Sequence, residues 1–225
     1  MSESFERARR SWLITFGDVI TLLLTFFIMM IVLHKGEVSK LQAWADNKVS
    51  STYQQLNDAV EKDQLEVISL KRSAQGILVS INHSNAFKSG DYVPSDQLRS
   101  ELELIGGLLK EASLFNVAQD QDARRVINLA KQAGLQWLTE VNIEGHTDSD
   151  RVDPHSRLRN NWFLSTMRAQ EVMQLLFVSS GLPAEYFSVD GYGEFQPIAS
   201  NDSAEDKAKN RRIDVLISAG FRKTL

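Results

Sequence analysis

The sequence predicts one membrane-spanning helix followed by a domain of the α/β class, in which helices pack on one sheet. Two observations support this fold. Residues 12–33 form an apolar run long enough to cross a bilayer, and from residue 76 onward short apolar segments alternate with amphipathic ones. The 225-residue chain is therefore expected to contain a tail (1–11), a transmembrane helix (12–33), a helical linker (34–75) and an α/β domain (76–225).

The apolar run reads WLITFGDVITLLLTFFIMMIVL over residues 12–33. As a helix it is about 33 Å long, and a hydrocarbon core is about 30 Å thick. A cleaved signal peptide has a shorter apolar region and a small-residue cleavage site, whereas the polar residues 34–37 follow this run directly. We therefore predict a retained, single membrane span.

Basic residues on the two sides of the run indicate its orientation. Arg7, Arg9 and Arg10 precede it, and Lys35 and Lys40 follow it. Because basic residues near a membrane helix favour the cytoplasmic side, we expect a cytoplasmic N-terminus.

Composition excludes several other classes of protein. The net charge is −4 with basic and acidic residues well mixed, which does not fit a nucleic-acid-binding surface. The chain has no cysteine, so disulfides, thiolate zinc sites and a cysteine nucleophile are excluded.

Residues from Leu41 to about Leu70 are expected to form an amphipathic helix, because apolar residues recur at helical spacing without proline or glycine. Such a helix needs a partner surface. It could lie on the membrane, pair with a second copy or connect two parts of the chain.

Further elements are bounded by local signals. Ser95 follows Pro94 as a helix cap, and Gly181 and Pro183 end a long helix. We predict strands at 76–81, 141–145, 187–190 and 213–217, and helices at 95–109, 120–133 and 161–180.

Asp18 is the only formally charged residue within the span. An ionised carboxylate there costs about 2.5 to 3.5 kcal/mol on an insertion scale, so a compensating environment is needed. The side chain could reach the cytoplasmic interface, or it could bind a cation in a protein-lined path. Thr21 and Thr25 follow on the same helix face and would support such a path.

Residues 11–27 (SWLITFGDVITLLLTFF) resemble the transmembrane segment of the MotB/PomB family, the B subunits of flagellar stators. The resemblance implies that Asp18 carries the transported ion, while Gly17 replaces a more usual alanine. It also implies an inner-membrane homodimer inside a ring of multi-span A subunits, which acts on a rotor. A proton is the expected ion and sodium the alternative; no cofactor is expected.

Four further fragments resemble the OmpA-like domain: EGHTD (144–148), NWFLSTMRA (161–169), GYG (191–193) and NRR (210–212). The resemblance implies helices on a mixed sheet and a periplasmic domain that binds peptidoglycan. Diaminopimelate in the stem peptide carries an ammonium and carboxylates. The family's ligand pair falls on Asp148 for the ammonium and Arg168 for the carboxylate. The expected walls and supports of the site are Thr147, Asn161, Leu164 and Arg212.

The sequence also departs from these family patterns. The stretch at 112–138 is longer than expected and could add a helix or a dimer contact. Phe163 replaces an acidic residue in the NWELS form of the motif. Residues 36–60 occupy the place of the family's plug.

Other functions are compatible with parts of the sequence. His146, Asp148 and His155 could bind a metal in a peptidoglycan hydrolase, but no HExxH motif accompanies them, so we expect no enzyme. A passive wall tether, or a related motor outside the flagellum, such as a defence-associated one, remains an alternative.

Overall fold

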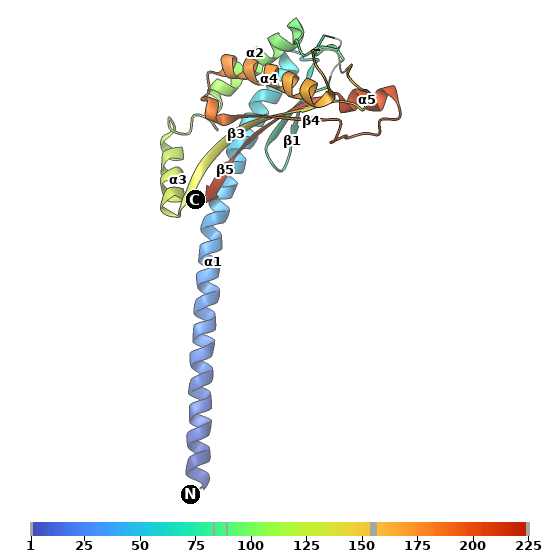
Figure 1. Ribbon diagram of the computed structural model, residues 1–225. Helices are drawn as coiled ribbons and strands as arrows, with labels where there is room; N and C mark the ends of the chain where they lie inside the picture. The colour runs from blue at the N-terminus through green and yellow to red at the C-terminus, as the bar shows by residue number, and fades with distance from the viewer. Residues whose placement is uncertain (1, 83, 89, 154–156, 224–225) are drawn as a thin grey trace. The chain divides into compact units, whose positions relative to one another are not determined.

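The computed structural model describes residues 2–82, 84–88, 90–153 and 157–223 (Figure 1). The chain forms two compact units, Met1–Trp44 and Ala45–Leu225. Helix α1 (Ser2–Lys62) makes up the described part of the first unit and begins the second.

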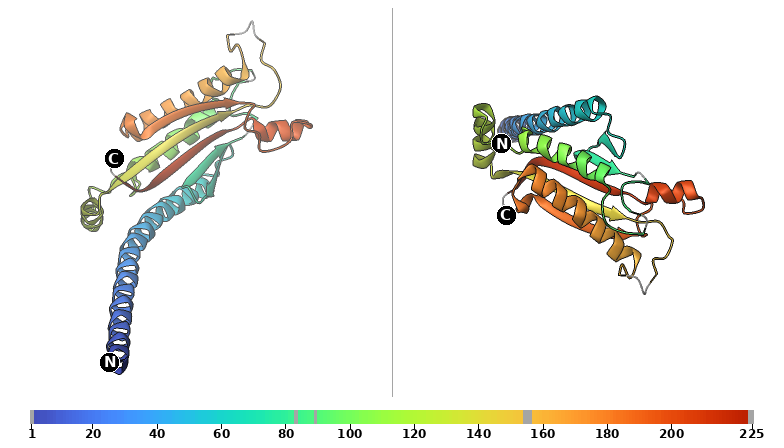
Figure 2. Two further views of the ribbon diagram at one scale, coloured as in Figure 1. Left: turned by 60° about the horizontal axis from the view of Figure 1, so that its bottom comes forward. Right: turned by 90° about the horizontal axis from the view of Figure 1, so that it is seen from above.

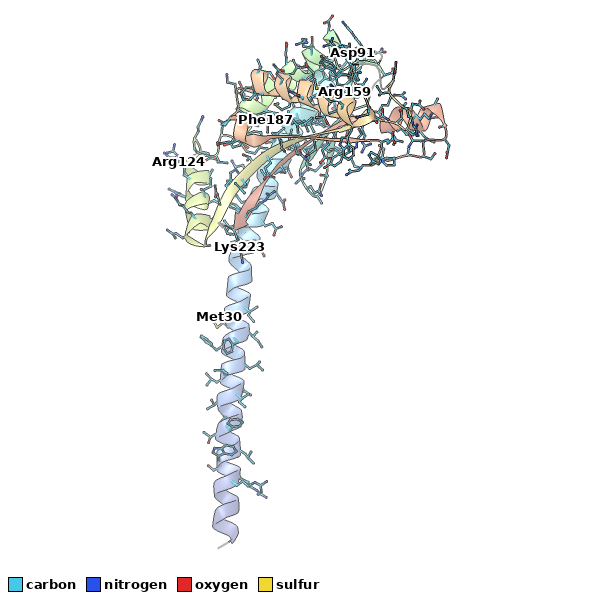
Figure 3. The ribbon with its side chains drawn as sticks, viewed as in Figure 1. Met30, Asp91, Arg124, Arg159, Phe187 and Lys223 are labelled. Carbon is cyan, nitrogen blue, oxygen red and sulfur yellow. The ribbon has the colours of Figure 1, made fainter. Side chains whose placement is uncertain are left out.

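The described part of the first unit is helical and contains a long apolar segment. Within α1, Arg9–Ile31 is the one described segment long and apolar enough to span a membrane. Its large apolar side chains are exposed in the isolated chain; Met30 is labelled in Figure 3. A helix without a polar face is stable in lipid or among other apolar helices, which fits the expected span.

The second unit contains a five-stranded mixed sheet in the order β1-β2-β5-β3-β4. Strands β3 and β4 are parallel and the other neighbours are antiparallel, which confirms the expected mixed sheet. The strands are β1 (Ile68–Arg72), β2 (Ile77–Ile81), β3 (Leu135–His146), β4 (Phe187–Gly193) and β5 (Ile213–Lys223).

Helices α2 (Asp96–Glu111) and α4 (Asn161–Ser180) lie over one face of this sheet, as the view from above shows (Figure 2). Alternate residues of β2 and β5 are buried beneath them, and the α1 residues Val49 and Leu56 join the same core. The remaining helices are α3 (Gln121–Gln132), the short 3-10 helix η1 (Ala184–Tyr186) and α5 (Ala204–Asn210).

Local signals set several element ends as expected. The Ser95 hydroxyl accepts a hydrogen bond from the Leu98 N–H at the start of α2. Gly181 ends α4 with φ +62°, a left-handed conformation that glycine adopts without a Cβ penalty. The expected helices at 95–109, 120–133 and 161–180 correspond to α2, α3 and α4.

One expected element is wrong. The helix predicted to reach about Leu70 ends at Lys62, and Ile68–Arg72 forms β1. Gln64 takes a positive φ of 51° in the intervening turn. The buried Glu101 carboxylate of α2 accepts hydrogen bonds from the N–H groups of residues 66–68 and so fixes the start of this strand.

The long stretch at 112–138 contains α3 and the beginning of β3. Both β3 and β5 are longer than expected, because their pairing extends from Gly145 with Ile213 to Leu135 with Lys223. The helix α5 was not predicted from the sequence.

Candidate functional site

The candidate site lies at one end of four neighbouring strands. Below, this edge of the sheet means the side formed by these strand ends. Ile81 at the end of β2 pairs with Ile213 at the start of β5, and Ile213 also pairs with Gly145 of β3. Gly145 in turn pairs with Gly191 of β4. Adjacent strands are about 4.8 Å apart, so residues flanking these four ends are brought close together.

Asp148 follows β3 at this edge and is only 6% exposed. Its Oδ2 accepts a hydrogen bond from Nη1 of Arg211 at 2.6 Å, and its Oδ1 accepts one from the Asp150 N–H at 3.0 Å. The sequence motif thus places a nearly buried carboxylate against a guanidinium that immediately follows α5.

Arg168 projects from α4 into the same cluster. Its Nε donates to the backbone carbonyl of Asp91 at 2.9 Å, and its guanidinium lies 5.0 Å from the centre of the Phe87 ring. Burial and the neighbouring charge of Arg211 lower the pKa of Arg168, while Asp148 and Asp91 oppose that change. Arginine remains protonated in such settings, so the site holds a desolvated cation in a fixed orientation.

A cavity of about 280 Å³ opens beside these residues. Four basic side chains are among its described lining: Lys88, Arg168, Arg211 and Arg212. Much of the rest comes from the loop between β2 and α2, in which Asp91 is labelled (Figure 3). Because Asp148 is bonded to Arg211 of this lining, the arrangement suits a ligand with carboxylates and an ammonium.

Asn161 at the start of α4 fixes the loop that carries Asp148. Its Nδ2 donates to the carbonyls of Asp148 at 3.3 Å and Asp150 at 2.9 Å, and to Oε2 of Glu194 at 2.6 Å. The buried amide thus joins the loop after β3 to the loop after β4.

The other expected supports are also buried at this edge. The Thr147 N–H donates to the Gly193 carbonyl at 2.9 Å, and its hydroxyl has no hydrogen-bond partner among the described residues. Arg212 Nε donates to Oδ2 of Asp214 at 2.7 Å, and Leu164 is buried in α4. The structure therefore gathers all six expected residues in one region, and their roles in binding stay predictions.

Close packing of α4 on β3 depends on Gly145. A Cβ at this position would lie 2.1 Å from the Ser165 carbonyl oxygen. Glycine therefore lets the helix backbone approach the strand end, which positions both Asn161 and Arg168 of α4.

Sequence reasoning missed three contributors. Arg211 is part of the NRR motif but had no predicted role, and Phe87 and Asp91 belong to no motif. Phe87 and Asp91 lie in the loop after β2. The pairing of β2 with β5 brings this loop to the site, and this pairing could not be inferred from local sequence.

His146 is 2% exposed and stacks on Tyr192, with ring centres 5.4 Å apart. Burial, followed by the charge of Arg212, lowers its pKa to about 4. No group of three His, Asp or Glu side chains able to hold a metal occurs among the described residues. His155, the other histidine of the metal alternative, lies outside the described residues.

Asp18 lies in the first unit, within the apolar segment of α1. The Thr21 hydroxyl donates to the Asp18 backbone carbonyl and the Thr25 hydroxyl to that of Leu22, each at 2.9 Å. Both hydroxyls keep lone pairs that can accept further hydrogen bonds. The expected ion-binding roles of these residues stay predictions.

Comparisons with known proteins match both units. Residues 2–47 match the family described as membrane MotB of the proton-channel complex MotA/MotB, and residues 110–211 match the OmpA family. Motility protein B of Bacillus subtilis is 30% identical over 242 aligned residues, covering 94% of this chain and 92% of that protein.

Solved structures show the same fold in the second unit. A putative MotB-like protein from Desulfovibrio vulgaris superposes with TM-score 0.58 and 20% identity, covering 79% of this chain and 98% of that one. The cell wall anchor of the T6SS from Pseudomonas aeruginosa gives TM-score 0.50 and 28% identity, with 74% and 95% covered. Together with the full-length match, these findings show that the chain belongs to the MotB family of motility proteins and carries a C-terminal OmpA-family domain.

Proposed function

We propose that this protein is the B subunit of an ion-driven stator in the bacterial inner membrane. One observation carries the proposal: a single chain joins a lone carboxylate in an apolar helix, Asp18, to a nearly buried acid paired with arginine, Asp148. The first group can bind a transported cation, and the second can hold the complex to peptidoglycan.

Wall binding follows from the charges of the site. The diaminopimelate of a stem peptide offers one side-chain ammonium and carboxylates, which match Asp148 and Arg168. Without a ligand, Arg211 forms an ion pair with Asp148, and the Arg211 side chain is 42% exposed. It can therefore turn toward a ligand carboxylate as the ammonium approaches Asp148.

The apolar helix supports the proposed ion coupling. Because its large apolar side chains are exposed on all sides in the isolated chain, this segment has room to pack against other membrane helices. We infer that two copies supply two such helices within a ring of multi-span A subunits. Asp18 then binds and releases a proton, or sodium in the alternative, and Thr21 and Thr25 offer polar neighbours.

The N-terminus is proposed to face the cytoplasm and the OmpA-family domain the periplasm, where peptidoglycan lies. With the domain held to the wall, changes in helix contacts at Asp18 would exert torque on a rotor through the A subunits. The motor output that is lost when the protein is inactivated in its own cell would identify the motor that it drives.

Motility of cells carrying Asp18→Asn tests this function, with membrane abundance measured by immunoblot. We expect loss of motility at normal abundance, because an amide has almost the same shape but cannot take up a transported proton. Asp58→Asn, at an exposed position in the second unit, is the matched control, and cells that carry it should swim normally. Unchanged motility in Asp18→Asn would refute ion coupling through this residue.

A passive wall tether is the second candidate, and the similarity to the T6SS cell wall anchor favours it. The tether predicts full function in Asp18→Asn and loss of function in Asp148→Ala. The stator predicts loss in both variants.

A further inference from the structure

We propose that Trp162 and Phe195 form a platform for a sugar ring of the peptidoglycan glycan strand, beside the site for the stem peptide. This inference rests on the proposed function, because it assigns the glycan strand of peptidoglycan to a surface beside the site proposed for the stem peptide.

The two rings are unusually open to solvent. Trp162 is 57% exposed and Phe195 is 66% exposed, and their ring centres are 5.3 Å apart with planes inclined at 46°. Tryptophan is highly buried on average in folded proteins, and it is enriched where proteins form contacts. The pair is therefore a candidate binding surface.

The backbone beneath the rings is held in place. Gly193 donates its N–H to the Ser165 hydroxyl at 3.0 Å, which fixes the end of β4 to α4. Asn161, directly before Trp162, donates to the Glu194 carboxylate, directly before Phe195, at 2.6 Å. The backbone that carries the two rings is thus fixed before a ligand arrives, which lowers the entropy cost of binding.

The same amide connects the platform to the stem-peptide site. Asn161 also donates to the backbone carbonyls of Asp148 and Asp150. Asp148 follows β3, Phe195 follows the neighbouring strand β4, and the basic cavity involves β2, β5 and the end of β3. The aromatic pair and the cavity therefore flank Asp148, at a separation of about two strand spacings, or about 10 Å.

A sugar fits this position chemically. The face of an aromatic ring is electron-rich, and the C–H groups on one face of a pyranose are weakly positive. In peptidoglycan, the stem peptide is attached to the muramic acid of the glycan strand. A ligand with its diaminopimelate near Asp148 would therefore carry sugars toward one side of the site.

A second copy of the chain fits less well. A stable protein interface buries about 800 Å² on each partner, far more than two rings provide. Charged groups also lie close to the pair: Glu194 directly precedes Phe195, and Asp150, which is bonded to Asn161, forms an ion pair with Lys207.

Two ligands test the inference on the full-length chain in detergent. One is the free tripeptide L-Ala-γ-D-Glu-meso-diaminopimelate, and the other is the same tripeptide on the disaccharide of N-acetylglucosamine and N-acetylmuramic acid. Binding is measured by calorimetry for the wild type, Trp162→Ala, Phe195→Ala and Trp162→Phe. Leu129→Ala, which removes an exposed apolar side chain on α3, is the matched control.

We expect the wild type and Leu129→Ala to bind the disaccharide ligand about tenfold more tightly than the tripeptide. Trp162→Ala and Phe195→Ala should lose most of this increment while binding the tripeptide normally, which also shows that they are folded. Trp162→Phe should keep most of it.

An equal affinity of the wild type for the two ligands would overturn the sugar platform and leave the proposed wall binding intact. An affinity increment for the disaccharide ligand that persists in both alanine variants would overturn it too. Failure of the wild type to bind either ligand would overturn the proposed function together with this inference.

Discussion

Acidification should destabilise the second unit through the buried imidazole of His146. The ring is 2% exposed and stacks on Tyr192. Its pKa falls from 6.5 to about 4, mainly because burial disfavours the charged form and next because Arg212 repels it. Asp214 opposes this change, and the Glu144 carboxylate, 3.9 Å from Nε2, does not reverse it.

The sign and size of the effect follow from proton linkage. The unfolded imidazole takes up a proton near pH 6.5, whereas the folded one does so only near pH 4. Between these values the unfolded chain binds more protons, so stability is complete above pH 6.5 and falls as the pH decreases. At 1.36 kcal/mol per pKa unit the full loss is about 3 kcal/mol, and about 2.5 kcal/mol is lost by pH 4.5.

Urea unfolding of the full chain in detergent, followed by tryptophan fluorescence at pH 7.5, 6.0, 5.0 and 4.5, measures this loss. His146→Phe is the reference, because it keeps a ring against Tyr192 and does not titrate. Glu144, whose pKa is raised by burial and by Asp214, acts with the opposite sign and is present in both proteins. We expect the wild type to lose about 2.5 kcal/mol more than the variant between pH 7.5 and 4.5. If the free energies of unfolding of the wild type and His146→Phe change in parallel with pH, the loss cannot be assigned to His146.

Two further predictions concern buried charges. Glu101→Ala leaves the N–H groups of residues 66–68 without their carboxylate acceptor and should lower the free energy of unfolding in urea by about 3 kcal/mol. Glu103→Ala, at an exposed position of the same helix, should change it little, and equal effects would contradict the reasoning. Arg168→Lys keeps the charge but loses the planar fork, so calorimetry should show about tenfold weaker binding of the diaminopimelate tripeptide. Arg151→Lys, an exposed control, should bind normally, and an unchanged affinity of the Arg168 variant would argue against a bidentate contact.

The sequence predicted most clearly the elements whose ends carry their own chemistry. Helix α4 occupies the predicted residues 161–180, because Asn160 caps its first turn and Gly181 provides the left-handed residue after it. The short apolar segment at 76–81 likewise predicted β2. For α4, the deciding interactions lie within a few residues of its ends.

Elements that depend on distant contacts were missed. Residues 68–72 continue an apolar spacing compatible with a helix, yet they pair with β2 and receive their first hydrogen-bond acceptor from Glu101, more than 30 residues away. The same cause explains Arg211. In the NRR motif, only the placement of α5 beside the end of β3 decides which arginine reaches Asp148.

The construction of the site is also suited to a wall anchor that carries force. Its charged groups follow the ends of strands or project from α4, and Asn161 fastens the loop of Asp148 to the loop after β4. A pull on a ligand held by Asp148 and Arg168 would therefore load several hydrogen-bonded strands and a packed helix together. Because local openings require breaking these elements cooperatively, such a site resists detachment better than one on a free loop. The apolar segment around Asp18 differs, because its large apolar side chains are exposed in the isolated chain and can contact the partner helices that the proposed stator requires.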